Sequence, residues 1–481
     1  MKEKILLAFI GIIFSFTAIR AQSHADLYSK DIKAKNLKEH VYILASDSCA
    51  GREVGTLGIK IARDYIVSQW EENAVLQAYF EKTCLQAFPL LTFEKKVPHL
   101  QTNNTELFSD KDFMYSGFFD DFNKELPIVF AGYGREEDFK NLDVKGKAVF
   151  TLNDNLRAAI RNARIAKEHG AELSIVANPK SSNQFESIVL QFKDFNRFKK
   201  CKLPNEVDVD DAMKGVLDCR YMTISSKNVK KLTGKSIQHW KNEAIVGNES
   251  IGEIKLSVEP MKVDTIVENN VVAYIPGTNA NESIIVGAHY DHLGTVDNKI
   301  YYGADDNASG VSALIELSKA FEKAYQDGYK PEKNIIFAAF SAEEAGIWGS
   351  KYFADHLENK EQVKLMINID MIGRADYHHE NDPGYFYFIG KHLADSLYTQ
   401  EKQLSKKYKL TSNYSSITDY SDNRSFSEIG IPSIFFFDGK NHDLHKPTDT
   451  VNKVNYKRME KISRMIFECI WRNALVSKNN E

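Results

Sequence analysis

The sequence predicts an α/β protein with a mostly-β module inserted into it, and three observations lead to that prediction. Along the second half of the chain, short apolar strands alternate with amphipathic helices, which is typical of α/β sheets. Two helices around a Gly-rich turn precede residue 76, and strand-like alternation follows over residues 76–97. Between these parts, residues 106–250 show short strands and one expected helix. Both ends of the chain are therefore expected to build one domain around an insertion.

The bulk composition is that of a globular protein with more than one domain. The chain has 481 residues, of which 43% are hydrophobic and 27% are charged. Its 62 basic and 66 acidic residues give a formal net charge of −4. This balance provides no global attraction to nucleic acid or to an anionic membrane, and it leaves small substrates open. The five cysteines are too few and too scattered for a disulfide scaffold.

Residues 1–21 have the pattern of a signal peptide. Lysines stand at positions 2 and 4, an apolar run extends from Ile5 to about Ile19, and the small Ala21 is a suitable cleavage point. No later segment approaches the roughly 18 uninterrupted apolar residues that span a bilayer. We therefore expect an exported protein, periplasmic or secreted, without stable membrane insertion.

The change in sequence texture divides the rest of the chain into three parts. Residues 22–105 form the first part of the α/β domain, residues 106–250 the insertion, and residues 251–481 the second part of the α/β domain. In the first part, Gly51, Gly55 and Gly58 make a turn feasible before a helix expected over residues 57–72. The insertion contains no cluster of ligand-type residues, so no chemistry is assigned to it.

In the second part, strands and helices are expected to alternate regularly. Strands are expected over residues 270–275, 284–288, 334–340, 364–370 and 430–437. Helices are expected over residues 309–324, 346–357 and 394–407, and from about residue 457 onward.

Histidine and acidic side chains follow four of these strands directly. In chain order they are His289, Asp291 and His292, then Asp305 and Asp306 in a Gly-rich turn, Glu343 and Glu344, Asp370, and finally His442, Asp443, His445 and Asp449. A single histidine after a strand is more often a hydrogen-bonded structural residue, and acids at a helix start are often only solvated. Matching chemistry at four strand ends of one sheet, where α/β folds place their sites, instead indicates a metal centre.

Two imidazoles and three carboxylates in this set are suited to zinc, namely His289, Asp306, Glu344, Asp370 and His445. If Asp306 bridges them, two zinc ions would lie about 3.5–4 Å apart. Three carboxylates and two divalent ions leave about one positive charge, which favours hydroxide over water at neutral pH. Glu343 is then predicted to take the proton of the water and to pass it to the leaving amine.

The neighbouring residues are given supporting roles. Asp291 is expected to orient the imidazole of His289 and to be part of the catalytic machinery, and Asp449 is expected to act similarly near His445. His292 and His442 are expected to be structural or supporting residues rather than ligands.

The motifs HYDH, GADDNASG, SAEEAG, NIDMIG and HKPTDT, in this order, resemble the co-catalytic zinc aminopeptidase family, which includes glutamate carboxypeptidase and transferrin-receptor relatives. The segment LASDSCAGREVGTLG resembles the N-terminal segment of that family, and IVFAGYG and LDVKGKAVF resemble its inserted protease-associated domain. The resemblance covers nearly all of the chain after residue 21. It implies a three-layer α/β/α sandwich with a mixed central sheet.

The resemblance also implies roles for individual residues. His289 and Asp370 would bind one zinc ion, Glu344 and His445 the other, and Asp306 both, with Glu343 as general base. A cis peptide bond would follow Asp306. Many relatives carry Tyr directly before the last ligand histidine, whereas this chain has Leu444; oxyanion support would then come from the zinc ions or from another group such as Tyr420.

These observations predict an exported zinc exopeptidase that acts on peptides, most directly an aminopeptidase. One alternative within the fold is a carboxypeptidase, dipeptidase or cyclising enzyme, for which Arg374 and Arg424 are the nearby candidates for a carboxylate clamp. The other alternative is a catalytically silent binding protein. Side-chain preference, oligomeric state and the role of the insertion remain open.

Overall fold

The structure, a computed structural model, describes residues 24–94, 97–102, 105–109, 111–116, 122–155, 159–181, 183–189, 200–204, 219–241, 247–259, 262–382, 384–415 and 421–478. The predicted signal peptide and Tyr420 lie outside these ranges. The chain divides into two compact units. The first comprises Met1–Leu90, Cys201–Leu203 and Thr265–Glu481, and the second comprises Leu91–Lys200 and Pro204–Asp264.

A ten-stranded mixed sheet forms the centre of the first unit. Its strand order is β20 (Thr411–Ser415), β19 (Tyr385–Lys391), β21 (Ser433–Phe437), β18 (Val363–Asp370), β13 (Asn279–His289), β17 (Lys333–Phe340), β12 (Lys262–Ile275), β2 (Leu85–Glu94) and β9 (Lys200–Lys202), with β1 (Gln77–Ala78) beside β12. The four neighbours β17, β13, β18 and β21 run parallel, so their carboxyl ends meet at one edge. The predicted α/β fold with a mixed central sheet is confirmed.

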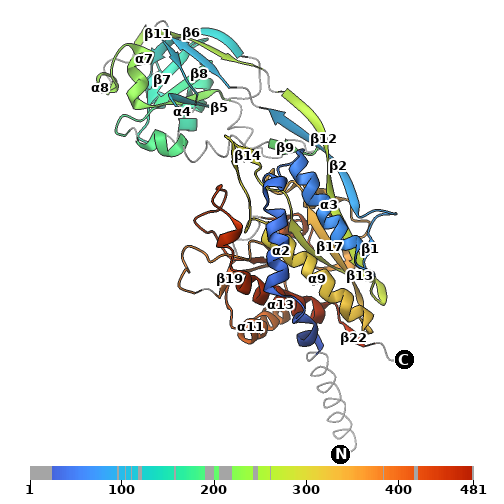
Figure 1. The fold of residues 1–481 in the computed structure, drawn as a ribbon. Helices are drawn as coiled ribbons and strands as arrows, with labels where there is room; N and C mark the ends of the chain where they lie inside the picture. Colours follow the sequence, from blue (N-terminus) through green and yellow to red (C-terminus); the bar gives the residue numbers. More distant parts are fainter. Residues whose placement is uncertain are drawn as a thin grey trace, which may run out of the picture. The chain divides into compact units, whose positions relative to one another are not determined.

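Helices cover both faces of this sheet, and Figure 1 labels those of one face. On one face pack α2 (Ala34–Leu44), α3 (Leu57–Glu71), α9 (Ala308–Gln326), α11 (Asp395–Tyr408) and α13 (Tyr456–Asn473); on the other pack α10 (Trp348–Asp355) and α12 (Asn423–Ser427). Successive strand residues point to opposite faces. Accordingly, Ile284 and Val286 of β13 join the core of the first face, whereas Ile285 joins that of the second. Three layers result.

The helices begin and end near the predicted positions because their apolar spacing and caps are local signals. The side chain of Thr56 accepts a hydrogen bond from the backbone of Ile59 and caps α3, and Asn307 caps α9 in the same way through Gly310.

Short elements complete the unit: β14 (Thr295–Val296) pairs with β15 (Lys299–Ile300), and β16 (Tyr329–Lys330) pairs with β22 (Ser477–Lys478). No described helix combines the length and the apolar character needed to cross a membrane.

The second unit is built on an eight-stranded sheet. Its strand order is β4 (Glu106–Leu107), β3 (His99–Thr102), β11 (Gly247–Val258), β6 (Phe122–Phe130), β7 (Ala148–Leu152), β8 (Leu173–Ala177), β10 (Tyr221–Ile224) and β5 (Phe113–Ser116), and α4 (Ala159–Glu168), α7 (Val229–Thr233) and α8 (Ile237–Trp240) accompany it. The sequence placed the insertion at residues 106–250. In the structure its unit begins at Leu91 and ends at Asp264, because β3 and β11 pair with each other inside this sheet.

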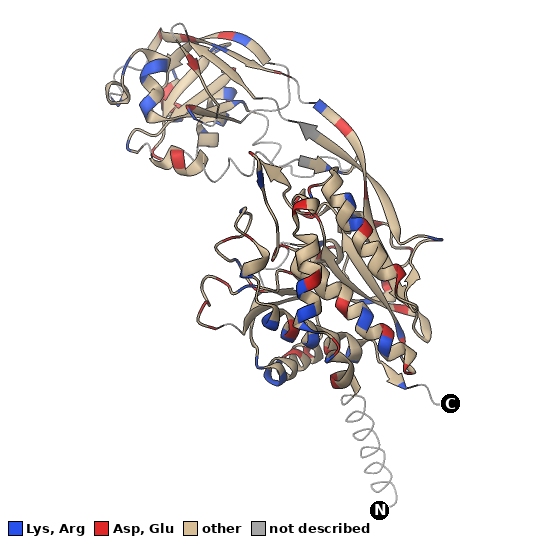
Figure 2. Ribbon diagram, viewed as in Figure 1, with Lys and Arg blue, Asp and Glu red and all other residues tan. Residues whose placement is uncertain are grey.

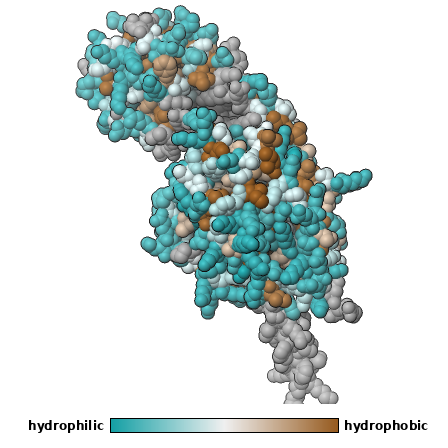
Figure 3. All heavy atoms as spheres, viewed as in Figure 1, coloured by the Kyte–Doolittle hydropathy of each residue, from teal (hydrophilic) through white to brown (hydrophobic). Residues whose placement is uncertain are grey.

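The surface chemistry of both units is mixed. Acidic and basic residues are interspersed along the helices of the first unit (Figure 2). The visible face of each unit is mostly hydrophilic (Figure 3). The only segment of the insertion that belongs to the first unit is Cys201–Leu203, where the indole N–H of Trp348 donates to the carbonyl of Cys201 at 2.6 Å.

Candidate metal centre

The predicted ligands lie at the carboxyl ends of the four parallel strands. His289 is the last residue of β13 and Asp370 is the last residue of β18. Glu344 follows β17 in the turn before α10, His445 lies in the loop after β21, and Asp306 lies directly before the cap of α9. Strands that are far apart in sequence therefore bring the five side chains to one edge of the sheet.

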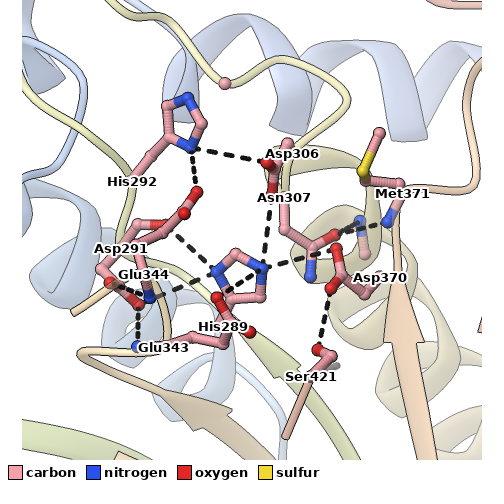
Figure 4. Close-up of polar contacts among 12 residues, drawn as sticks. His289, Asp291, His292, Asp306, Asn307, Glu343, Glu344, Asp370, Met371 and Ser421 are labelled. Carbon is pink, nitrogen blue, oxygen red and sulfur yellow. Dashed lines mark hydrogen bonds and ion pairs between the residues drawn. The ribbon is translucent and has the colours of Figure 1, made fainter. Parts of the chain in front are cut away.

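His289, Asp370 and one oxygen of Asp306 form what we call the inner group. The Nε2 atom of His289 lies 3.4 Å from Oδ1 of Asp306 and 3.4 Å from Oδ1 of Asp370 (Figure 4). The His289 side chain is 1% exposed and that of Asp370 is 10% exposed. Among the described residues, neither His289 Nε2 nor Asp370 Oδ1 has a hydrogen-bond partner. Tetrahedral ligands at about 2.1 Å from one zinc ion stand about 3.4 Å apart, so this spacing fits a metal ion.

Glu344, His445 and the other oxygen of Asp306 form what we call the outer group. The Nε2 atom of His445 lies 3.1 Å from Oε2 of Glu344 and 3.2 Å from Oδ2 of Asp306. The His445 side chain is 49% exposed, in contrast to His289. Asp306 thus turns one carboxylate oxygen toward each group, which is the arrangement that a bridging ligand requires.

His292 lies closer to the outer group than the sequence indicated. Its Nδ1 atom is 2.6 Å from Oε1 of Glu344 and 3.9 Å from Oδ2 of Asp306, and its side chain is fully buried. Together with Asp306 and Glu344 it forms a second set that could hold a metal ion, beside the set of His289, Asp306 and Asp370. Only the position of His292 in the HYDH motif could have indicated this contact from the sequence.

Asp291 contacts the turn that carries the two glutamates. Its carboxylate accepts the backbone N–H groups of Glu343 at 3.0 Å and Glu344 at 3.2 Å (Figure 4). The expected link to His289 is longer: Oδ1 of Asp291 lies 3.8 Å from Nδ1 of His289, and that nitrogen is 3.2 Å from the Asp291 carbonyl. Asp291 therefore positions both the predicted base and an outer ligand.

Asp449 supports the bridging residue rather than His445. Its carboxylate accepts the backbone N–H groups of Asp305 at 3.0 Å and Asp306 at 3.2 Å. This differs from the predicted place beside His445, because the end of the HKPTDT motif itself contacts the Gly-rich turn. Asp305 in turn accepts the N–H of Gly373 at 2.8 Å.

Asn307 connects the bridging residue to the end of β18. The expected cis peptide bond joins Asp306 to Asn307. The Asn307 side chain donates to the carbonyl of Ile369 at 2.9 Å and accepts from Met371 at 3.2 Å (Figure 4). The residues on both sides of Asp370 are thereby fixed relative to Asp306.

The ionisable groups of the centre shift one another strongly. Burial lowers the pKa of His289, but Asp370 and Glu343 outweigh burial and hold that pKa well above its usual value. Glu344 above all raises the pKa of His445 to about 12. Burial raises the pKa of Asp306, yet the nearby imidazoles of His289 and His445 keep it well below the usual range. Burial raises the pKa of Glu343 well above normal, and the imidazole of His289 opposes that shift.

The two arginines that could clamp a substrate carboxylate are both paired with acids. Nη2 of Arg374 donates to Asp443 at 2.9 Å, and Nε of Arg424 donates to Glu428 at 2.7 Å. His442, expected to be structural or supporting, is exposed and lies 3.2 Å from Glu380.

The comparisons with known proteins agree with this site. Residues 270–470 match the model of peptidase family M28, a range that contains all five predicted ligands. These residues therefore match a peptidase family M28 domain.

Individual relatives support the family and the fold. Aminopeptidase YwaD of Bacillus subtilis is 23% identical over 355 residues, which cover 72% of this chain and 66% of that protein. The chain spans between 48% and 66% of the length of the first three curated relatives that it matches. An aminopeptidase from Aneurinibacillus sp. strain AM-1 has the same fold, with a TM-score of 0.63, 20% identity and coverage of 95% of this chain and 97% of that one. A zinc aminopeptidase from Bacillus subtilis gives a TM-score of 0.59 at 19% identity, covering 94% and 97%.

Proposed function

We propose that the chain is an exported aminopeptidase that binds two zinc ions and removes N-terminal residues from peptides. The observation that carries the proposal is the orientation of Asp306, whose two oxygens face two separate imidazoles at 3.4 and 3.2 Å. One carboxylate between two such groups is the geometry of a shared ligand. The aminopeptidases among the relatives support the choice of reaction.

The ligands of this proposal follow from the two groups. The inner group would hold one zinc ion and the outer group the other, with Asp306 common to both. His292 would orient Glu344, since it contacts the oxygen that faces away from His445. When bound, the two ions supply Lewis-acid chemistry, which polarises the scissile carbonyl and lowers the pKa of a water molecule.

The residues of the chain perform the remaining steps. Glu343 would accept the proton of the attacking water and return it to the leaving amine. Its Oε2 atom lies 4.0 Å from Nε2 of His289, and its side chain is 11% exposed, so it stands beside the inner group and is shielded from bulk water. Asp291 would keep Glu343 in place through the backbone hydrogen bond at 3.0 Å.

An aminopeptidase fits the surroundings better than a carboxypeptidase does. A carboxypeptidase needs a cation for the terminal carboxylate, and the guanidinium groups of Arg374 and Arg424 already pair with Asp443 and Glu428. A silent binding protein would have no need for a buried nitrogen of His289 and a buried oxygen of Asp370 that both lack a hydrogen-bond partner among the described residues.

Export and the nature of the insertion are part of the same proposal. Residues 1–21 would be removed as a signal peptide, and the second unit would be a protease-associated domain. The N-terminal sequence of protein recovered from the periplasm or medium of an expressing host tests export directly. Full-length protein retained in the cytoplasm would contradict it.

The reaction is tested with matched peptides and a metal assay. Purified protein is loaded with zinc, and the zinc content per chain is measured by atomic emission. The protein is then offered a peptide library with free N-termini and the same library N-acetylated. We expect about two zinc ions per chain, as in two-metal sites, and release of N-terminal residues only from the free peptides. Cleavage of the blocked library from its C-terminal end would instead support the carboxypeptidase, and no cleavage of either library would refute the peptidase.

A further inference from the structure

Arg52 is a fully buried arginine, and every hydrogen bond that its side chain donates goes to a backbone carbonyl oxygen. Its exposed fraction is 0%. The guanidinium donates to the carbonyl oxygens of Leu44, Tyr290, Tyr302 and Gly303 at 2.7–2.9 Å, and a fifth contact reaches the carbonyl of Asp306 at 3.5 Å. An arginine side chain has five N–H donors, so these contacts use its whole set.

The carbonyls that Arg52 contacts belong to the segments that carry the metal centre. Tyr290 stands between His289 and Asp291, and Gly303 opens the turn that contains Asp306. The planar guanidinium therefore spans the end of β13 and the Gly-rich turn with one rigid group. Each segment is held by at least one hydrogen bond of ordinary length.

The backbone around Arg52 reinforces the same connection. Its carbonyl accepts the N–H of His292 at 3.2 Å, and the carbonyl of Gly51 accepts that of Gly294 at 2.9 Å. A Cβ atom on Gly51 would stand 2.4 Å from the carbonyl oxygen of Gly294, so the approach of the two segments requires glycine there. Residues 51 and 52 are thus in contact with the loop between His289 and Asp306 through both backbone and side chain.

The charge of Arg52 is also suited to this place. Burial lowers the pKa of its guanidinium, and the carboxylates of Asp306, Asp291 and Asp449 oppose that effect. A buried charge is costly unless opposite charge lies near it. The acids of the metal centre provide that opposite charge without a direct ion pair, which leaves their oxygens available to ligands.

We propose that Arg52, from the part of the chain before the family M28 match, is a positioning residue that holds His289 and Asp306 at the separation required by two metal ions. The proposal rests on the proposed function for the identity of the metal. The geometric role can be measured without peptide cleavage.

The test compares Arg52→Met and Arg52→Lys with Arg464→Met. Arg464 is a matched control, because it also donates to backbone carbonyls of the N-terminal segment, those of Ile32 at 3.0 Å and Lys30 at 3.4 Å, and has no contact with the metal centre among its hydrogen bonds. Zinc affinity is measured by competition with a chromophoric chelator. The absorption spectrum of the Co²⁺-loaded protein reports ligand geometry, and kcat and KM are measured separately.

For Arg52→Met we expect at least one zinc ion to bind about 10–100-fold more weakly, with an altered Co²⁺ spectrum. Once zinc is saturating, kcat should fall by about 10–100-fold while KM changes little, because Arg52 is fully buried and out of reach of a substrate. Arg52→Lys retains the charge with three donors, so its zinc affinity should lie between those of Arg52→Met and the unaltered protein. Arg464→Met should resemble the unaltered protein in every readout.

Unchanged zinc affinity and an unchanged Co²⁺ spectrum in Arg52→Met would overturn the proposal. If Arg52→Met does not fold, the zinc affinity and the Co²⁺ spectrum of Arg52→Lys decide the test. Failure of both variants to fold at saturating zinc would also overturn the proposal, since Arg52 would then serve the fold as a whole. A protein that binds two metal ions and depends on Arg52 for them, but cleaves no peptide, would refute the proposed function and leave the positioning role intact.

Discussion

The inner and outer groups of the metal centre are built in different ways. The inner residues His289 and Asp370 are the final residues of paired parallel strands, and their side chains are 1% and 10% exposed. The outer residues Glu344 and His445 follow their strands in turns, and the His445 side chain is 49% exposed. The inner group is therefore fixed by the sheet, whereas the outer group depends on contacts from neighbouring side chains and loops.

Removing the carboxylate that the two groups are proposed to share should weaken zinc binding at both groups. In Asp306→Asn, the side chain loses its charge and can no longer offer an anionic oxygen to each group. Activity should fall by more than about 100-fold, because replacing a residue that only supports a ligand already costs up to about 100-fold. Zinc content should fall below that of the unaltered protein at both the inner and the outer group. Zinc content and kcat/KM check this, with Asp31→Asn as a control, because Asp31 pairs with Lys323 at the surface. Retention of two zinc ions would contradict a bridging role.

The second largest effect is expected at the residue that supports the glutamate turn. In Asp291→Asn, one carboxylate oxygen becomes an amide NH₂ group, so only one of the two backbone N–H groups, that of Glu343 or that of Glu344, keeps its acceptor. We expect kcat to fall by about 10–100-fold. Kinetics at saturating zinc, with zinc content measured on the same samples, separate misplaced Glu343 from lost metal. A variant with normal kcat would show that the backbone bonds are not needed.

The pH dependence of zinc binding should differ little between the groups. The pKa of His289 is held well above its usual value in the metal-free chain, and that of His445 is raised to about 12. Below these pKa values each imidazole carries a proton that zinc must displace. Zinc affinity should therefore fall as pH falls, by about tenfold per pH unit for each proton displaced.

Calorimetry in two buffers of different ionisation enthalpy measures the protons released on zinc binding. We expect about two protons per chain near neutral pH, one from each imidazole, and about one in His445→Ala. Release of no proton would show that the imidazoles are neutral in the metal-free chain.

A chelator should remove zinc from the outer group faster than from the inner group. Because His445 is half exposed and His289 is buried, a chelator reaches the outer ion first. Zinc content followed during dialysis against a chelator should fall in two phases, with about one ion lost in each. Loss of both ions in one phase would mean that the difference in burial does not control access.

The sequence was sufficient to predict which side chains the sheet brings together, because strand ends are local signals. An apolar run that stops at His289 or Asp370 marks both the strand and the residue that emerges at its end. The contacts of His292 with Glu344, of Asp449 with Asp306 and of Arg52 with Tyr290 join residues far apart in sequence, and no periodic pattern encodes them. The boundaries of the insertion differed for the same reason, since β3 and β11 are assigned to its sheet by pairing across the whole insertion.

The smallest effect concerns the loop that carries His445. Asp443 lies 2.9 Å from Arg374 and 2.6 Å from Lys453, and these cations and Thr448 lower its pKa although burial raises it. A lowered pKa in the folded state adds stability that is fully present above the unfolded value and is lost as pH falls through the acid range. In Asp443→Asn we therefore expect a loss of about 1 kcal/mol near neutral pH, since Lys453 is largely in solvent, and almost none at low pH. Asp355→Asn, which removes an exposed pair with Lys351, should cost less. Denaturant unfolding of zinc-free protein at several pH values measures this, and a loss that is equal at all pH values would show that the charge of Asp443 does not hold the outer loop.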